Sequence, residues 1–317
     1  MSILSVVVLT YKPSYISLLR TIKSILFQKE IEYELIIADD CTPFDNNTID
    51  RVEEYINKFG FDNYRIIKNV KNTGTVKNLL NALSYTKGDY IKVMGQGDFL
   101  YDETTLFDMY NSIKEKKSSL LFGNYTCFEN TEDSIKIVKR EELPYNINAY
   151  VRCDRDSIKK SLVLLCDVIL GASVMYKKDV LKNTLEKCKD DVVYGEDYLI
   201  RVMGINDEKI DYLNRNVILY EWGSGVSTSG NSEFRKRLDI DWNNVGKILC
   251  ESSKDLSYSD DLRDVVEYHY VPEEKKKKAL SFYLKHIDIG LFKFKKIFFK
   301  RTSPLIIDEE FVNKCIK

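Results

Sequence analysis

The sequence predicts an α/β fold built on an open, mostly parallel β-sheet flanked by helices. Short runs rich in β-branched and aromatic residues recur along the first part of the chain, at residues 3–9, 33–38 and 90–94. The segments between these runs carry apolar residues at helical spacing. Strands that alternate with helices form βαβ units, and the strands of such units are parallel.

The first elements follow this alternation closely. Residues 3–9 form a continuous apolar run, as expected for a strand covered on both faces. A helical pattern follows and ends near Gln28, and residues 33–38 form a second buried strand. A second amphipathic helix ends at Gly60, because glycine is a common helix terminator, and residues 64–67 form a third strand.

The next elements continue the same pattern. A turn at residues 72–75 opens a third helix, and residues 90–94 form the fourth strand. We expect a helix at residues 104–115 and another strand at residues 119–122.

Beyond Asn124 the pattern is looser. We expect a hairpin or an excursion at residues 128–150, and a helix from residue 163 that breaks at Gly171 and leads into a strand. Residues 212–220 alternate like a strand, and the last part of the chain is mainly helical in pattern.

Polar side chains follow three of the predicted strands at the point where each strand ends. Thr10 and Tyr11 follow the first strand, Asp39 and Asp40 follow the second, and Asp98 follows the fourth. Right-handed crossovers place the carboxyl ends of parallel strands at one edge of the sheet, where ligands bind. Carboxylates there can hold a divalent cation bound to a diphosphate, or accept hydrogen bonds from a base or a ribose. The ring of Tyr11 can stack on a base.

The fourth strand stops abruptly at Gly95, Gln96, Gly97 and Asp98. The two glycines let the backbone approach a ligand closely, and a carboxylate follows them. The alternative is an ordinary polar turn after a strand.

A second acidic pair, Glu196 and Asp197, opens a predicted helix. One of these carboxylates can face the same cleft as a general base. The alternative is a solvated helix start whose negative charge complements the helix dipole.

Composition excludes several other classes of protein. The chain has 317 residues, 44% hydrophobic and 31% charged, as is typical of a soluble globular protein, and a net charge of −1 gives no support for nucleic acid as a partner. Seven cysteines without a CxxC pair and only two histidines argue against a disulfide framework, a zinc site and a Ser-His-Asp triad. Neither a signal peptide nor a membrane span is recognisable, so we expect a cytoplasmic protein.

The first glycine of the chain is Gly60. A glycine-rich phosphate loop directly after the first strand is therefore absent, which excludes an N-terminal dinucleotide-binding fingerprint and disfavours a sugar nucleotidyltransferase.

Seven features occur in the order seen in family 2 glycosyltransferases of the GT-A fold, over residues 1–230. They are VVVLTYKP, Gln28, ELIIADDCT, NTGTVKN, GDYIKVMGQGDFL, GASVMYKKDVL and YGEDYLIR. The resemblance implies an inverting transferase of bacterial polysaccharide or glycan biosynthesis. It would move a hexosyl or N-acetylhexosaminyl group from a nucleotide sugar, usually a UDP sugar, to a hydroxyl of a growing glycan, including lipid-linked glycans, with Mn²⁺ or Mg²⁺.

The resemblance also implies a division of the chain and roles for individual residues. A nucleotide-binding half (1–123) and an acceptor-binding half (124–230) would form the GT-A domain, followed by a helical extension (231–317). Donor-binding positions would be Thr10, Tyr11, Asp39, Asp40, Lys77, Gln96, Gly97 and Asp98. Thr10, Tyr11 and Asp40 look like the uracil pocket, and Asp98 looks like the ligand of the metal and the diphosphate.

In the second half, Asp197 looks like the general base that deprotonates the acceptor hydroxyl, with Glu196 beside it. Trp222, Ser227 and Thr228 lie in a small-residue segment that resembles the lid over donor and acceptor.

One departure from the family pattern concerns the metal. The family usually shows two or three acids where this chain has Gly95, Gln96, Gly97 and only Asp98. A metal would then rely on diphosphate oxygens and water, and Gln96 would have to replace the usual ribose contact. This departure supports the alternative of a non-catalytic GT-A-fold subunit that binds a partner or an acceptor.

The C-terminal part is basic. Residues 271–317 carry 12 Lys or Arg against 6 Asp or Glu. Residues 287–301 form an amphipathic helical pattern, with Ile287, Leu291, Phe294 and Phe298 on one face and Lys293, Lys296 and Lys300 opposite. Such a helix can lie on the anionic inner face of a membrane as a peripheral contact. The alternative is that its apolar face packs on the domain while its lysines face solvent.

Overall fold

The computed structural model describes residues 4–131, 134–223, 232–254, 257–270, 281–298 and 301–317. The strands are β1 Leu4–Thr10, β2 Tyr33–Asp39, β3 Tyr64–Lys68, β4 Tyr90–Gly95, β5 Phe99–Leu100, β6 Leu120–Asn130, β7 Ile135–Val138, β8 Val174–Lys177 and β9 Ile210–Glu221. The α-helices that precede β9 are α1 Tyr15–Leu26, α2 Thr48–Phe59, α3 Thr75–Leu83, α4 Thr105–Lys116, α5 Ile147–Val151, α6 Arg155–Val163, α7 Lys178–Cys188 and α8 Ile200–Ile205. The later helices are α9 Ser232–Ser252, α10 Ser259–Tyr270, α12 Ile287–Phe298 and α13 Glu309–Ile316, and two 3₁₀ turns are η1 Gly171–Ser173 and η2 Asp197–Leu199.

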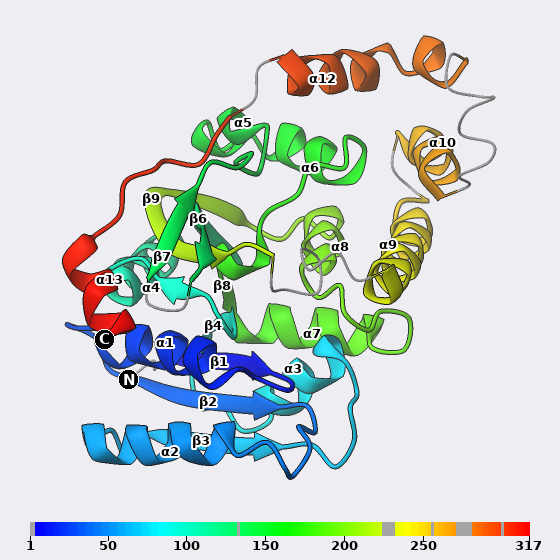
Figure 1. The fold of residues 1–317 in the computed structure, drawn as a ribbon. Coiled ribbons are helices and arrows are strands. Elements are labelled where there is room, and N and C mark those ends of the chain that lie inside the picture. The colour runs from blue at the N-terminus through cyan, green and yellow to red at the C-terminus, as the bar shows by residue number, and fades with distance from the viewer. Residues whose placement is uncertain (1–3, 132–133, 224–231, 255–256, 271–280, 299–300) are drawn as a thin grey trace.

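One sheet organises the molecule, with helices on both of its faces (Figure 1). Its strand order is β3-β2-β1-β4-β8-β6-β9-β5, and β7 pairs with β6. The first four strands are parallel, whereas β8 runs antiparallel to both β4 and β6. The predicted α/β fold is therefore confirmed, and the complete sheet is mixed.

The parallel ladder aligns the strand ends as expected. Thr10 pairs with Asp39 of β2, and Leu9 pairs with Gly95 of β4. The polar residues that end these strands therefore meet at one edge of the sheet.

Strand β1 is covered on both faces, as its apolar run predicts. Val7 joins an apolar cluster with Leu79 of α3, and Val6 and Val8 join another with residues of α1 and α2. Alternate side chains of a strand point to opposite faces, so a continuous apolar run supplies both cores.

The expectation of a helix from residue 163 was wrong. Helix α6 instead ends at Val163, and the residues up to Gly171 have no regular structure. Cys166 has a left-handed backbone (φ 53°), and the buried carboxylate of Asp167 accepts the backbone N–H of Tyr145 at 2.9 Å. Hydrogen bonding of the Asp167 side chain to the loop at Tyr145 therefore competes with a continuation of the helix beyond Val163.

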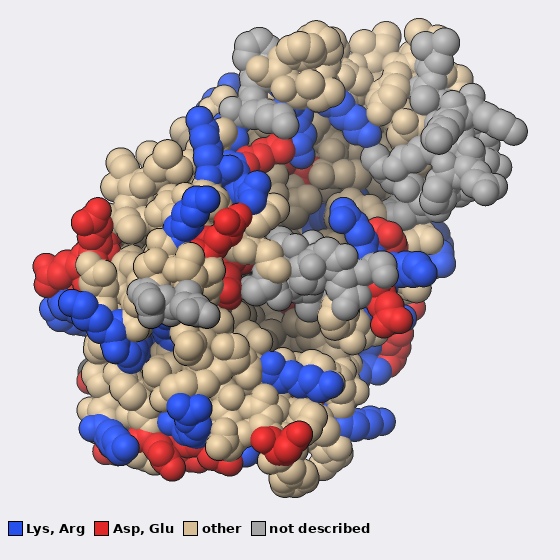
Figure 2. Space-filling view, viewed as in Figure 1, with Lys and Arg blue, Asp and Glu red and all other residues tan. Residues whose placement is uncertain are grey.

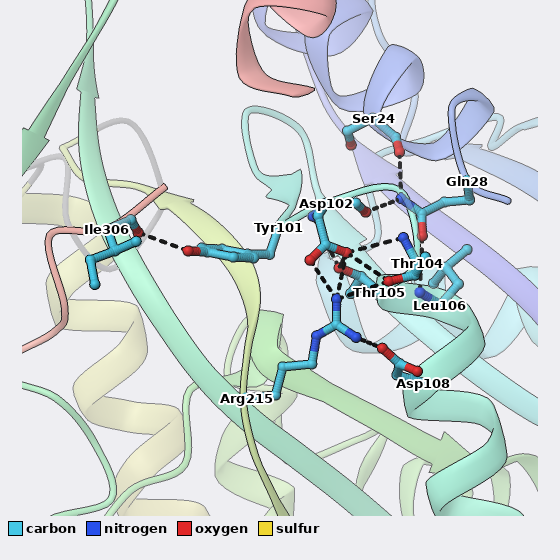
Figure 3. Close-up of polar contacts among 10 residues, drawn as sticks. All are labelled: Ser24, Gln28, Tyr101, Asp102, Thr104, Thr105, Leu106, Asp108, Arg215 and Ile306. Carbon is cyan, nitrogen blue, oxygen red and sulfur yellow. Dashed lines mark hydrogen bonds and ion pairs between the residues drawn. The ribbon is translucent and has the colours of Figure 1, made fainter. Parts of the chain in front are cut away.

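Gln28 connects α1 to the start of α4 (Figure 3). Its side-chain amide donates to the carbonyl oxygens of Ser24 at 3.1 Å and Asp102 at 2.6 Å, and its carbonyl oxygen accepts from the backbone N–H of Leu106 at 2.9 Å. Gln28 is buried, so these hydrogen bonds satisfy polar groups that water cannot reach.

Beside this connection, Arg215 of β9 forms ion pairs with Asp102 and Asp108 (Figure 3). Next to Asp102, the hydroxyl of Tyr101 donates to the carbonyl oxygen of Ile306 at 2.9 Å. The C-terminal segment is thereby tied to the sheet.

Helix α13 returns to the first helix of the chain, and the two termini lie on the same side of the molecule (Figure 1). Val312 of α13 packs in an apolar cluster with Phe99, Phe128 and Leu219.

Helix α12 presents its apolar face outward. Ile287, Leu291, Phe294 and Phe298 are 55–63% exposed. Lys293 lies instead against the rings of Tyr268 and Tyr283. The alternative that this apolar face packs on the domain is therefore wrong, because all four of these side chains are exposed. In the part of the chain that the structure describes, no helix is long and apolar enough to cross a membrane.

Substitution of Gln28 by Ala tests the connection between α1 and α4. We expect the free energy of unfolding to fall by about 1–3 kcal/mol, because a buried N–H and a carbonyl lose their partner. The matched control is Lys29→Ala, which removes an exposed ion pair with Glu103 and should change stability by less than about 0.5 kcal/mol. Urea denaturation measures both, and equal stability of the two variants would contradict this account.

Candidate active site

The ends of β1 and β2 bring the first predicted donor residues together. The hydroxyl of Thr10 donates to the side-chain oxygen of Gln96. The carboxylate of Asp39 accepts from the backbone N–H of Thr42 at 3.0 Å and from its hydroxyl at 2.5 Å. Tyr11 is 38% exposed, so its ring is open to a ligand.

Asp40 is buried and organises the turn before α3. Its carboxylate accepts from the backbone N–H groups of Thr73 at 2.9 Å and Gly74 at 2.8 Å, and from the side-chain amide of Asn69 at 2.9 Å. Sequence reasoning did not foresee this structural role. A contact of Asp40 with a nucleotide stays a prediction.

The turn held by Asp40 also touches the second half of the site. The backbone N–H of Val76 donates to the carbonyl oxygen of Val193 at 3.0 Å. A Cβ atom on Gly74, which has a left-handed backbone (φ 82°), would lie 2.3 Å from Cγ1 of Val193. Glycine is therefore required where this turn packs against the segment that carries Tyr194, Glu196 and Asp197.

Tyr194 shows how near this segment lies to Asp40. Its pKa is raised by burial first, and then by the negative charge of Asp40. Sequence reasoning did not single out Tyr194, although it lies between the predicted donor residues and the acidic pair.

A close contact between Gly97 and Glu221 closes the end of β4. Gly97 has a left-handed backbone (φ 100°), and a Cβ atom there would lie 1.8 Å from Oε2 of Glu221. The carboxylate of Asp98 accepts from the backbone N–H of Glu221 at 3.0 Å. Glu221 was missed from the sequence, where its only signal is an acid at the end of an alternating strand.

Lys92 is wholly buried beneath this turn. Its ammonium donates to the carbonyl oxygens of Val93 at 2.9 Å and Ala172 at 2.5 Å. Burial lowers the pKa of Lys92 to about 7. Burial also raises the pKa of Asp98 to about 8, although the charge of Lys92 acts in the opposite direction.

Asp197, with Glu196 beside it, packs against η1, whose Ala172 carbonyl oxygen accepts from Lys92. A Cβ atom on Gly171 would lie 2.8 Å from Cβ of Asp197, so Gly171 lets η1 and η2 approach closely. Burial raises the pKa of both carboxyl groups, and the charge of Asp197 raises that of Glu196 further. A carboxylate with a raised pKa is a better proton acceptor than one with an ordinary pKa.

The remaining predicted residues lie as follows. Lys77 is exposed and pairs with Asp190 at 3.0 Å. Trp222 follows Glu221 directly, and the guanidinium of Arg140 lies 4.6 Å from the centre of its ring. Ser227 and Thr228 lie outside the described residues.

The donor set at Asp98 does not fit a resident divalent cation. One of its oxygens already accepts from Glu221, and its electrostatic neighbours include the buried ammonium of Lys92. Within the described residues, no three His, Cys, Asp or Glu side chains are arranged to hold a metal. Mg²⁺ and Mn²⁺ prefer about six oxygen ligands, so water and a ligand would have to supply nearly all of them.

Substitution of Gly97 by Ala should destabilise the protein by two effects, backbone strain and the collision with Glu221. The control is Gly60→Ala, which also has a positive φ (82°) but nothing within 4 Å of a Cβ atom. We expect Gly97→Ala to lose about 1–3 kcal/mol more than Gly60→Ala, because overpacking adds to the strain.

A double-mutant cycle assigns the difference. With Glu221→Ala in the background, Gly97→Ala should cost no more than Gly60→Ala. If the excess cost survives the removal of Glu221, the collision is not its cause.

The model of "Glycosyl transferase family 2" matches residues 5–185. A curated relative is "Poly(ribitol-phosphate) beta-N-acetylglucosaminyltransferase TarP" of Staphylococcus aureus (strain N315), with 28% identity over 194 residues, or 60% of this chain and 54% of TarP. The chain thus matches about half the length of that relative.

Solved structures of S. aureus TarS are similar in fold. TarS 1-349 in complex with UDP-GlcNAc gives a TM-score of 0.55 at 18% identity, covering 89% of this chain and 76% of that one. The complex with UDP gives 0.53 at 17% identity, covering 89% and 75%. Because the family model covers more than half of the sequence, this chain belongs to glycosyl transferase family 2.

Proposed function

We propose that this protein transfers an N-acetylhexosaminyl or hexosyl group from a UDP sugar to a hydroxyl of a growing bacterial glycan, with inversion at the anomeric carbon. The observation that supports the proposal is that the 3₁₀ turn η1 contacts both groups. The carbonyl oxygen of Ala172 accepts from Lys92, whose charge acts on Asp98, and Gly171 lies close to Cβ of Asp197.

The choice of donor follows the relatives. TarS structures contain UDP or UDP-GlcNAc, and TarP is named as an N-acetylglucosaminyltransferase. We propose that Thr10, Tyr11, Asp39 and Asp40 form the base pocket. Lys77, Gln96, Gly97 and Asp98 would then lie along the ribose and diphosphate.

The proposed reaction is an in-line displacement. Asp197 takes the proton of the acceptor hydroxyl while that oxygen forms a bond to the anomeric carbon. The bond from the same carbon to the diphosphate oxygen breaks, and UDP leaves with the electron pair. Glu196 lies beside Asp197, and the charge of Asp197 adds to burial in raising the pKa of Glu196 to about 8. Trp222, Ser227 and Thr228 stay predicted lid residues.

Dependence on Mn²⁺ or Mg²⁺ through Asp98 also stays a prediction. The donor set described above supports at most a cation that arrives with the UDP sugar. The second candidate function is a non-catalytic GT-A-fold subunit that binds a partner or an acceptor, and the single acid of the β4 turn favours it.

We also propose that residues 287–301 form a peripheral membrane-binding surface. This surface would contact the cytoplasmic side of the membrane that carries lipid-linked acceptors. Figure 2 shows that uncharged residues dominate the surface over α12. Leu291 and Phe294 are exposed there, and Lys295, which directly follows Phe294, is also exposed. Apolar side chains flanked by cations suit the interface of an anionic bilayer.

Substitution of Asp197 by Asn tests the reaction. We expect kcat to fall by about 10²–10⁴-fold, because the proton acceptor is lost, while UDP-sugar affinity is unchanged. Asp98→Ala should lose both activity and binding. Isothermal titration with a UDP sugar, with Mn²⁺ or with EDTA, together with a UDP-release assay measures these quantities.

The pH dependence has a defined sign. The pKa of Asp197 is raised by burial, and the base must be ionised to act. The rate should therefore fall as pH decreases through a range above that of an ordinary aspartate. Near-normal turnover of Asp197→Asn rules out this base, and UDP-sugar binding without turnover by the wild type favours the non-catalytic subunit.

Flotation with anionic liposomes tests the membrane surface. Truncation near Lys285 would also remove α13, so a point substitution is sharper. Phe294→Asp should abolish flotation by placing a charge in the apolar face. Phe44→Asp, at an exposed phenylalanine outside this helix, should float like the wild type. Unchanged flotation of Phe294→Asp refutes the proposed contact.

A further inference from the structure

Helix α9 contributes a buried carboxylate to the segment that leads to the acidic pair. Asp241 has no exposed surface. Its Oδ2 accepts the backbone N–H of Tyr194 at 2.6 Å and the backbone N–H of Gly195 at 3.1 Å. These two amides immediately precede Glu196, so Asp241 fixes the backbone from which both acids extend.

Aromatic contacts hold the same segment from both sides of Asp241. The ring of Phe234 lies 5.6 Å from that of Tyr194, edge to face. The ring of Trp242 lies 4.9 Å from that of Tyr198, also edge to face. Together with Asp241, they fix α9 against residues 194–198.

The segment has little freedom to compensate for the loss of these bonds. A Cβ atom on Gly195 would lie 2.4 Å from the ring of Tyr198, so the turn is closely packed around its glycine. Two backbone N–H groups that lose their acceptor there would have to move in order to find another. Movement of the turn would displace Glu196 and Asp197 with it.

The charge of Asp241 also acts on Glu196. It raises the pKa of Glu196, in addition to burial and the charge of Asp197. The other groups that face the pair are Tyr176 of β8 and Tyr198 of the turn, whose pKa values are in turn raised by the two acids. Nε of Arg237 lies 3.5 Å from Oδ1 of Asp241 and offsets part of its charge.

We propose that Asp241 is a positioning residue for the transfer reaction, which holds the turn of Glu196 and Asp197 in its productive place. This inference rests on the proposed function. Helix α9 lies beyond residues 5–185, the part of the chain that the family model matches, so the family match does not assign the role.

Three variants test the proposal. Asp241→Ala removes the acceptor and the charge. Asp241→Asn keeps an acceptor oxygen but removes the charge. Asp239→Asn is the matched control, because it makes the same change of charge at an exposed position of the same helix.

Asp241→Ala should lower kcat about 10–100-fold with little change in the KM for the UDP sugar, because a misplaced base slows only the chemical step. Asp241→Asn should retain more activity. Asp239→Asn should match the wild type in kcat and in KM. A kcat of Asp241→Ala equal to that of Asp239→Asn, or a fall in kcat no smaller in Asp241→Asn than in Asp241→Ala, overturns the proposal.

Hydrogen–deuterium exchange gives a readout that needs no turnover. The amides of Tyr194 and Gly195 should exchange faster in Asp241→Ala than in Asp239→Asn, and equal exchange overturns the anchoring role. If the wild type turns over no UDP sugar, the proposed function fails, and exchange still decides whether Asp241 holds the turn. If Asp241→Ala does not fold, Asp241→Asn carries the test, because an amide oxygen is a weaker acceptor than a carboxylate and should leave the amides of Tyr194 and Gly195 exchanging faster than in Asp239→Asn.

Discussion

The parallel pairing of β1 with β2 and β4 is the constraint on which the site depends. This register places Thr10 beside Asp39 and Leu9 beside Gly95, so that the turn from Gln96 to Asp98 begins level with the end of β1. A shift of one residue would exchange the two faces of the strand and move its apolar side chains out of their cores. The burial of β1 on both faces therefore fixes the position of the donor residues as well as the fold.

The acids of the scaffold and those of the site differ in their partners. Asp102 accepts two bonds from the guanidinium of Arg215, and Glu142 pairs with Arg301 at 2.9 Å. Glu196 and Asp197, in contrast, lie next to each other with a third carboxylate, Asp241, nearby. Gathering like charges in a buried place is destabilising, and such arrangements are typical of functional sites. The fold supports this one through backbone amides and aromatic rings.

Periodicity was enough to predict the strands of the first half and the edge at which they end, because buried parallel strands have a distinctive apolar pattern. The end of α2 at Gly60 followed from the residue type alone. The role of Asp241 could not be predicted, since an acid within a helical pattern looks the same whether it faces water or a distant turn. The contact of Glu221 with the β4 turn could not be predicted for a related reason, because it depends on the close approach of Gly97 to Glu221 in space.

The orientation of α12 shows another limit. Its sequence gives two faces but does not say which one meets the domain. Packing decided this, because the rings of Tyr268 and Tyr283 accommodate Lys293. Likewise, the end of α6 at Val163 depends on hydrogen bonds from Asp167 to a loop some 20 residues earlier in the chain, which no local pattern reveals.

The packing of α13 on α1 sets the order in which the protein can be completed during synthesis. Phe311, Val312 and Cys315 are almost fully buried, and Val312 contacts strands made long before it. Until the ribosome has released residues 309–316, the apolar surface beneath them stays open to other chains and to chaperones. Translation speed through the C-terminal helices therefore determines how long the nascent sheet is exposed to aggregation.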